Sequence, residues 1–142
     1  MTAVLGTRAP SSVRTQPIAT SDDVVRARQL ARTLAVECAL SLVEQTKLVT
    51  AASELARNTL VYGGGGRMDG EVLERTGGRG VRLTFADEGP GIADVELALR
   101  DGWSSGTGMG LGLSGARRLM DHFDLCTAIG EGTTVTVIKW TH

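Results

Sequence analysis

The chain has 142 residues, of which 42% are hydrophobic, and a formal net charge of −1. This length fits one domain, and the hydrophobic fraction excludes a disordered chain. The balanced charge gives no reason to expect binding to nucleic acid or to an anionic membrane, and no apolar run approaches the ~20 residues of a membrane span. The N-terminal apolar stretch is too short for a signal peptide, so we expect a cytoplasmic protein.

The chain is predicted to fold as one unit after a short tail. Residues 1–14 show no hydrophobic periodicity and should form a flexible tail, which leaves residues 15–142 as a single domain. An edge strand is expected at residues 15–20. The two cysteines, Cys38 and Cys126, lie in apolar patterns without CxxC spacing, so we expect two buried free thiols and no disulfide.

A first amphipathic helix is expected from Ser21, which would be its N-cap, with Asp22 and Asp23 in the first turn. Apolar residues then recur at helical spacing, at Val24, Ala27, Ala31, Leu34 and Cys38. Three arginines lie off this stripe, at Arg26, Arg28 and Arg32. A solvated face is the favoured interpretation of these arginines, and a docking surface for an acidic partner is the alternative.

A second helix is expected over residues 43–62, where a broad apolar stripe indicates that most of the helix is buried. Glu54 and Asn58 stand one helical turn apart beside this buried face, where polar side chains need partners. One interpretation pairs Glu54 with Lys47 or Arg57 near the surface. The other places Glu54 and Asn58 in the wall of a site, and the pair alone does not decide between the two.

Glycines at 63–66 should end this helix, and a hairpin follows, with strands at about 70–76 and 80–87 joined by Gly77-Gly78. Successive side chains of a strand point to opposite faces of the sheet. Asp87 falls on the face of its strand that carries the apolar side chains. A carboxylate at a strand end on the core side indicates a pocket wall rather than a solvent-exposed position.

The C-terminal part should contain a short helix at about 94–99, a helix at 110–123, and strands at about 124–129 and 133–140. Thr133, like Asp87, lies at a strand end on the apolar side. A glycine-rich segment leads into the longer helix, and the free N–H groups at a helix start can bind an anion. The ligand is therefore expected to carry phosphate.

The pattern GxGxxG at 110–115 formally matches a dinucleotide fingerprint. A Rossmann site requires a strand directly before the first glycine, whereas a polar loop, residues 101–107, precedes this one. No Gly-Lys-Ser/Thr sequence occurs, which excludes a Walker A motif. A different kind of nucleotide site is therefore expected.

Four motifs occur in order along the chain: Glu54-x-x-x-Asn58, Asp87-x-Gly89-x-Gly91, Gly106-x-Gly108-x-Gly110-Leu111-Gly112 and Gly132-Thr133. In this order and spacing they resemble the GHKL (Bergerat-fold) ATPase and kinase superfamily, over about residues 17–140. Within it, the chain is similar to the small serine/threonine kinases of the anti-sigma regulatory group, and most similar to RsbT-type switch kinases. The expected fold is an α/β (α+β) two-layer sandwich with a mixed, largely antiparallel sheet and helices on one face.

The resemblance implies a role for each motif. Asp87 would accept a hydrogen bond from the adenine amino group, and Thr133 would support the same edge of the base. The base pocket would be shaped by Gly89, Gly91 and Ile92, and the phosphates would be bound by backbone N–H groups of Gly108, Gly110, Leu111, Gly112 and Leu113. Asn58 would ligate Mg²⁺ through its amide oxygen, and Glu54 would be the general base.

The implied function is phosphorylation, by ATP and Mg²⁺, of a Ser or Thr in a STAS-domain antagonist protein. The kinase would then move to another partner, such as a PP2C-type phosphatase or a sigma factor. The alternative is a nucleotide-gated binding module with little or no catalysis. The cation that meets the γ-phosphate stays open: Arg100 is one candidate, while Arg117 and Arg118 are expected to face solvent.

Overall fold

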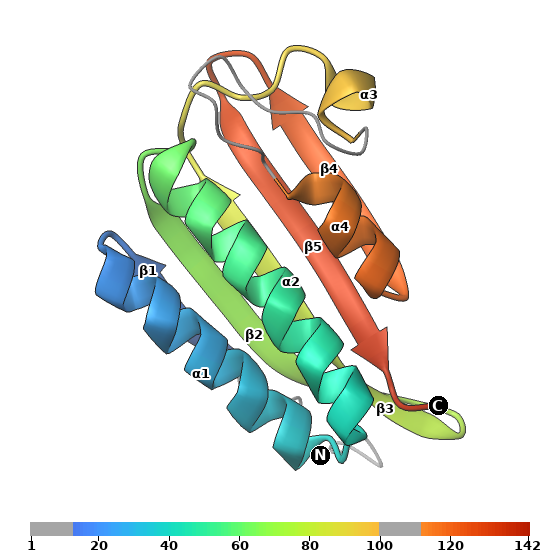
Figure 1. The fold of residues 1–142 in the computed structure, drawn as a ribbon. Helices are drawn as coiled ribbons and strands as arrows, with labels where there is room; N and C mark the ends of the chain where they lie inside the picture. The colour runs from blue at the N-terminus through green and yellow to red at the C-terminus, as the bar shows by residue number, and fades with distance from the viewer. Residues whose placement is uncertain (1–12, 100–111) are drawn as a thin grey trace, which may run out of the picture.

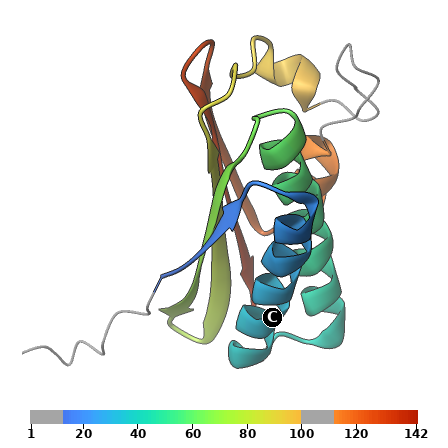
Figure 2. The same ribbon diagram turned by 90° about the vertical axis from the view of Figure 1, so that its left-hand side faces the viewer.

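Five strands form one sheet, and helices pack on one of its faces (Figures 1 and 2). This computed structural model describes residues 13–99 and 112–142, without the side chain of Leu97. The elements in chain order are β1 (Arg14–Ile18), α1 (Ser21–Glu37), α2 (Leu42–Val61), β2 (Gly66–Arg75), β3 (Gly78–Asp87), α3 (Val95–Ala98), α4 (Leu113–Leu119), β4 (His122–Ala128) and β5 (Gly132–Trp140). Most of the predicted tail, residues 1–12, lies outside the described residues.

The sheet has the strand order β1-β2-β3-β5-β4, and each of these neighbouring pairs is antiparallel. The predicted two-layer sandwich with a largely antiparallel sheet is confirmed, and the described strands contain no parallel pair. β3 lies at the centre, where its last residue, Asp87, pairs with Gly66 of β2 on one side and Thr133 of β5 on the other. This register brings three separate stretches of sequence to one end of the sheet.

Both long helices begin with a capping box, in which the N-cap side chain and the third helical residue exchange hydrogen bonds. Thr20 caps α1 together with Asp23, and Ser41 caps α2 together with Glu44. The expected N-cap of the first helix, Ser21, is therefore wrong by one residue. The reason is that only Thr20 has an acidic side chain three residues later to complete the box.

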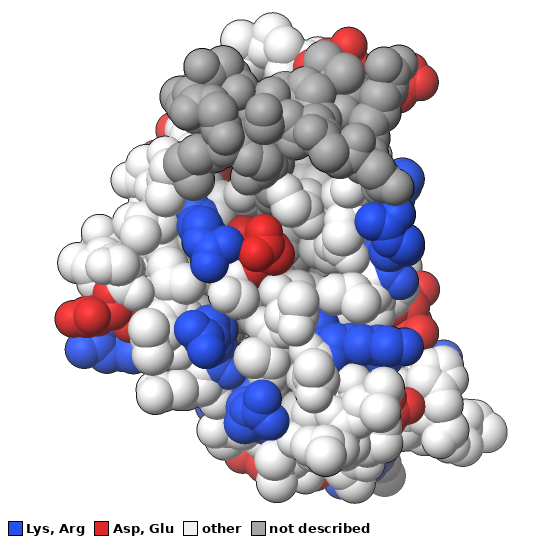
Figure 3. Space-filling view, viewed as in Figure 1, with Lys and Arg blue, Asp and Glu red and all other residues white. Residues whose placement is uncertain are grey.

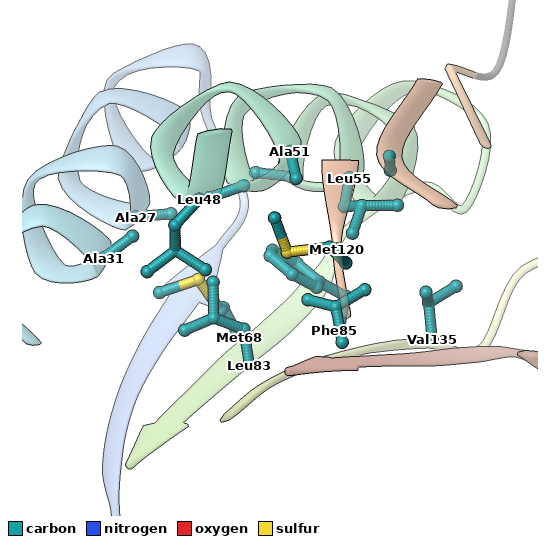
Figure 4. Close-up of a cluster of buried hydrophobic side chains, with 14 of the residues drawn as sticks. Ala27, Ala31, Leu48, Ala51, Leu55, Met68, Leu83, Phe85, Met120 and Val135 are labelled. Carbon is teal, nitrogen blue, oxygen red and sulfur yellow. The ribbon is translucent and has the colours of Figure 1, made fainter. Parts of the chain in front are cut away.

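The core lies between the sheet and the inner faces of α1 and α2 (Figure 4). Met68, Leu83 and Phe85 of the sheet meet Leu48 and Leu55 of α2, and all of these side chains are at most 2% exposed. Truncating such a residue to alanine typically costs about 2–5 kcal/mol. The packing of α2 on β3 therefore holds the end of α2 firmly beside the strand that carries Asp87.

Two element boundaries differ from the prediction for one physical reason, which is strand pairing. β2 begins at Gly66 rather than near residue 70, because Gly66 pairs with both Ile18 and Asp87. α4 ends at Leu119 rather than near residue 123, because His122 and Phe123 pair with β5 instead. In both places a ladder formed with distant residues outweighs the local pattern.

The environment of one cysteine also differs from the prediction. Cys38 is buried and free, as expected, but Cys126 is a free thiol that is exposed. Cys126 pairs with Thr134, and each is more exposed than its strand neighbour Thr127 or Thr133, which places both on the face of the sheet opposite the helices. Figure 2 shows that the helices leave this face uncovered. Among the described residues, no helix is both long and apolar enough to cross a membrane.

Candidate active site

A pocket lies between the C-terminal half of α2 and the adjoining end of the sheet. Five of the residues that the sequence singles out line it: Asn58, Asp87, Ile92, Leu113 and Thr133. They come from α2, β3, the loop after β3, α4 and β5. The remaining lining residues are Leu55, Thr59, Tyr62, Phe85 and Val135. The pocket is narrow, with a cavity volume of about 20 Å³.

Asp87 is half-buried at the end of β3 and is held by backbone groups. The Gly89 N–H donates to its Oδ1 at 2.8 Å, and the nearby Thr133 N–H also favours the charged form of the carboxylate. Burial raises the pKa of Asp87 above its ordinary value, and these two N–H groups only partly offset that effect. A partly desolvated carboxylate in a mainly apolar pocket gains most from a ligand that donates a hydrogen bond.

The hydroxyl of Thr127 connects the two sides of the pocket rim. It accepts a hydrogen bond from the Ile92 N–H at 2.9 Å and lies 2.9 Å from the hydroxyl of Thr133. It also donates to the carbonyl oxygen of Gly132 at 3.1 Å. The loop that carries Ile92 is thus joined to the hairpin that carries Thr133.

Two glycines allow backbone segments to approach each other behind the pocket. A Cβ on Gly63 would overlap the Asp87 carboxylate. Gly91 has a φ of +75°, and a Cβ there would overlap the carbonyl oxygen of Ala128. Larger residues at these positions would displace the carboxylate or the loop after β3. Gly91 lies in that loop and does not line the pocket, so its expected part in shaping the base pocket stays a prediction.

Glu54 and Asn58 lie one turn apart on α2, but only Asn58 lines the pocket. Oε1 of Glu54 pairs with Nη1 of Arg57 at 2.9 Å, which is the surface pairing that one interpretation proposed, with Arg57 rather than Lys47. Oε2 of Glu54 faces Gly112, where a Cβ would overlap it. Glu54 therefore belongs to a surface ion pair and also stands beside the start of α4, next to the pocket.

Several expected phosphate-binding residues, Gly108, Gly110 and Leu111, lie outside the described residues, as does Arg100. Gly112 is described as the N-cap of α4 with a φ of +68°, and Leu113 is buried in the pocket wall. Arg117 and Arg118 are exposed, as expected.

Three residues near the pocket were missed by the sequence reasoning: Gly63, Tyr62 and Thr127. The Tyr62 hydroxyl donates to the carbonyl oxygen of Gly91 at 3.1 Å and so holds the loop after β3 against α2. Thr127 was detectable, because a hairpin centred on the turn at residues 129–131 places it opposite Thr133. No local signal indicated the other two, since their roles depend on how α2 packs against the loop.

The donor chemistry of the pocket fits Mg-ATP. Asn58 offers an amide oxygen, which is a hard ligand of the kind that Mg²⁺ prefers, alongside phosphate oxygens and water. Within residues 13–99 and 112–142, no cluster of three His, Cys, Asp or Glu side chains could hold a metal by itself.

Known proteins share both the sequence pattern and the fold. Residues 43–141 match the family of histidine kinase-, DNA gyrase B-, and HSP90-like ATPases. The chain is 44% identical to the serine/threonine-protein kinase RsbT of Bacillus subtilis (strain 168) over 87% of its length and 92% of that protein. It is 31% identical to the anti-sigma F factor of Anoxybacillus flavithermus over 70% of its length and 71% of that protein.

A solved structure supports the fold. The RsbU and RsbW domains of a Mycobacterium tuberculosis protein superpose with a TM-score of 0.64 and 22% identity. The match covers 93% of this chain and 33% of that longer one. Taken with the family match and the 44% identity, the resemblance first inferred from four short motifs is confirmed. The chain belongs to the histidine kinase-, DNA gyrase B- and HSP90-like ATPase family, within its group of serine/threonine kinases and anti-sigma factors.

Proposed function

We propose that this serine/threonine kinase of the partner-switching type transfers the γ-phosphate of Mg-ATP to a STAS-domain antagonist protein in the cytoplasm. It then binds another partner, a PP2C-type phosphatase. The 44% identity to a named serine/threonine-protein kinase over most of both chains supports the activity. The observation that carries the site assignment is the convergence of Asn58, Asp87 and Thr133 on one pocket, with Glu54 at its edge.

In the proposed mechanism, Asp87 and Thr133 bind the adenine edge, and Asn58 holds Mg²⁺ through its amide oxygen. Mg²⁺, when bound, neutralises charge on the phosphates. Glu54 accepts the proton of the acceptor hydroxyl as that oxygen forms its bond to the γ-phosphorus, and ADP leaves with the electrons of the broken P–O bond. The ion pair with Arg57 orients the Glu54 carboxylate.

The decisive experiment replaces Glu54 with glutamine, which keeps the shape and removes the base. We expect Glu54→Gln to bind ATP as the wild type does and to lose ~10²–10⁴-fold in phosphorylation of a STAS-domain protein from the same organism. Glu74→Gln is the matched control, because Glu74 is also an exposed, arginine-paired carboxylate but lies in the β2–β3 hairpin. Equal phosphorylation by Glu54→Gln and the control would remove Glu54 from the mechanism.

A second candidate function is a nucleotide-gated binding module, which the matches to anti-sigma F factors favour. Besides the relative already described, the anti-sigma F factor of Halalkalibacterium halodurans is 33% identical over 68% of this chain and 69% of that protein. In this function the nucleotide selects which partner is held, for example a sigma factor. Wild-type protein that binds ATP and a partner yet phosphorylates no candidate STAS-domain protein would favour the module over the kinase.

A further inference from the structure

A groove is lined mainly by side chains of α1, with one residue from α2. The two helices lie side by side (Figure 1). Its cavity volume is about 570 Å³. The lining residues are Val25, Arg28, Gln29, Arg32, Thr33, Val36 and Glu37 of α1 and Val49 of α2. We call this set the α1–α2 groove. It shares no lining residue with the pocket described above.

The α1–α2 groove has an apolar floor and rim that solvent reaches. Val25 is 44% exposed and Val36 is 60% exposed, although the opposite side of α1 is buried in the core. Single exposed valines are common on protein surfaces and indicate nothing alone. Here they line one concave strip with Val49 of the neighbouring helix, which is the shape that receives an amphipathic helix.

The charge of the α1–α2 groove is positive. Arg28 and Arg32 stand one turn apart, and neither forms an ion pair with any residue in the described part of the chain. The one acidic lining residue, Glu37, is already neutralised by Arg14 at 2.8 Å. Like charges four residues apart on a helix repel each other, and an acidic partner would relieve this repulsion. Figure 3 shows separate Lys and Arg side chains among uncharged ones on this side of the molecule.

We propose that the α1–α2 groove docks an acidic amphipathic helix of a partner protein. Apolar residues of that helix rest on Val25, Val36 and Val49, and its carboxylates meet Arg28 and Arg32. The strip from residue 25 to residue 36 is ~16 Å long at 1.5 Å per residue, which matches three turns of a docked helix. This is the alternative interpretation of the α1 arginines, a docking surface, and the groove now favours it over a merely solvated face.

The test uses a synthetic helical peptide of leucine and glutamate with leucines at helical spacing, and a second peptide in which lysine replaces each glutamate. We expect the acidic peptide to shift the NMR signals of residues 25–37 and Val49. Arg28→Glu/Arg32→Glu should weaken its binding at least ~10-fold, while the lysine peptide should bind this variant better than the wild type. Arg67→Glu/Arg79→Glu carries the same charge change elsewhere and should bind the acidic peptide within ~3-fold of the wild type.

Three outcomes would overturn the docking proposal. The acidic peptide could shift signals elsewhere, or it could bind Arg28→Glu/Arg32→Glu as tightly as it binds the wild type. The third outcome is that the wild type self-associates in a sedimentation experiment and that Arg28→Glu/Arg32→Glu abolishes this self-association. The groove would then be an interface between two copies of the chain. A circular dichroism melt of both variants checks that they are folded.

A separate observation concerns the hydroxyl network at the pocket rim. A threonine hydroxyl has one proton and two lone pairs. Thr127 accepts from the Ile92 N–H and donates its only proton to the carbonyl oxygen of Gly132. In its 2.9 Å contact with Thr127 we assign Thr133 as the donor, because the proton of Thr127 then remains for the carbonyl oxygen of Gly132. Thr133, with its proton used, offers only lone pairs to the pocket.

We infer that Thr127 is a positioning residue that makes the pocket select adenine over guanine. This inference rests on the proposed nucleotide site. With Thr127 in place, both Thr133 and Asp87 are acceptors, which suits the amino group of adenine and opposes the carbonyl oxygen of guanine. Removing the Thr127 hydroxyl frees the Thr133 proton, so that Thr133 can donate to a guanine carbonyl.

Titration calorimetry with ATP and with GTP tests this role. Thr127→Val should reduce the ratio of ATP affinity to GTP affinity ~10-fold, because one partly buried hydrogen bond is misdirected. Thr127→Ser, which keeps the hydroxyl, should restore the wild-type ratio. Thr134→Val, on the uncovered face of the same hairpin, is the control. An unchanged preference in Thr127→Val would overturn only this inference. Wild-type protein that binds neither nucleotide would overturn the proposed function as well.

Discussion

At the scale of single residues, Asp87 combines a cost to stability with the proposed role in nucleotide binding. Burial raises its pKa, and the N–H groups of Gly89 and Thr133 only partly compensate. A carboxyl whose pKa is higher in the folded state stabilises the fold below its unfolded value of 3.8, and this stabilisation is lost as pH rises through the folded pKa. At neutral pH the charged carboxylate therefore destabilises the fold, and a ligand that donates a hydrogen bond to it can offset this cost.

The first prediction replaces Asp87 with asparagine. Because the substitution removes a desolvated charge, the unliganded Asp87→Asn protein should gain stability relative to the wild type as pH rises above about 4. ATP binding should be lost, because the substitution removes the negative charge and replaces one of the two acceptor oxygens with an NH₂ donor. Denaturant melts between pH 3 and pH 7, with calorimetric titration at pH 7, measure the two effects. A relative stability that falls with pH would contradict the sign of this argument.

The second prediction concerns Gly63, which would affect ligand binding only through the position of the Asp87 carboxylate. Gly63→Ala would place a Cβ where the Asp87 carboxylate lies, so the carboxylate must turn away. We expect ATP affinity to fall ~10-fold or more, with a loss of ~1–3 kcal/mol in unfolding free energy from overpacking. Gly115→Ala is the control, because a Cβ there meets nothing within 4 Å. Gly63→Ala with wild-type affinity would show that the carboxylate position is not critical.

At the scale of elements, Asp121 joins the end of α4 to the end of β5. Its carboxylate accepts from the backbone N–H of Trp140 at 2.7 Å, pairs with the Lys139 ammonium at 3.3 Å and contacts His142. The Lys139 side chain is only 7% exposed. Burial acts to raise the pKa of Asp121, but these three partners outweigh it and hold the pKa below its ordinary value.

The third prediction separates the two partners of this pair. Asp121→Ala leaves the Lys139 ammonium buried without its counter-ion and should cost about 3 kcal/mol of unfolding free energy at pH 7. Lys139→Met removes the buried charge and should change stability by less than ~1 kcal/mol. Because the folded pKa of Asp121 is depressed, its contribution exists above about pH 4 and is lost as pH falls through that lower value. Urea melts at pH 7 and pH 3 check both points, and equal losses from the two variants would contradict them.

At the scale of the whole molecule, the pocket joins elements that the sequence keeps far apart. α2, β3, α4 and β5 each contribute at least one lining residue, so a ligand bound there stabilises several elements at once. A ligand that binds only the folded state stabilises it by mass action. Nucleotide binding should therefore be visible as global stabilisation.

The fourth prediction is a thermal shift. ATP with Mg²⁺ at 100 times its dissociation constant should add about 2.7 kcal/mol to the free energy of unfolding and raise the melting temperature. The shift should be absent in Asp87→Asn, and it should be smaller for ATP without Mg²⁺. A melting temperature that ATP leaves unchanged in the wild type would contradict the proposed site directly.

The sequence by itself determined the long helices, the hairpins and the order of the motifs. Helical and strand periodicities are local, so the buried faces of α1, α2 and β3 were readable from residues a few positions apart. The position of Asp87 on the core side of its strand followed from alternation alone and agrees with its half-buried environment. The motif residues Asn58, Asp87 and Thr133 were likewise identified before the fold was known.

Only the tertiary structure decided where strands begin, on which face of the sheet Cys126 lies, and that Tyr62, Gly63 and Thr127 stand near the pocket. These features depend on hydrogen bonds and contacts between residues far apart in the sequence, and no local pattern encodes them. His122 and Phe123 continue a helical pattern in the sequence, but in the structure they form a β-strand that pairs with β5. In the same way, Glu54 meets Gly112 only because α2 and α4 pack together. Local sequence patterns indicated the residues of the candidate site, and strand pairing and helix packing between distant parts of the chain bring these residues together.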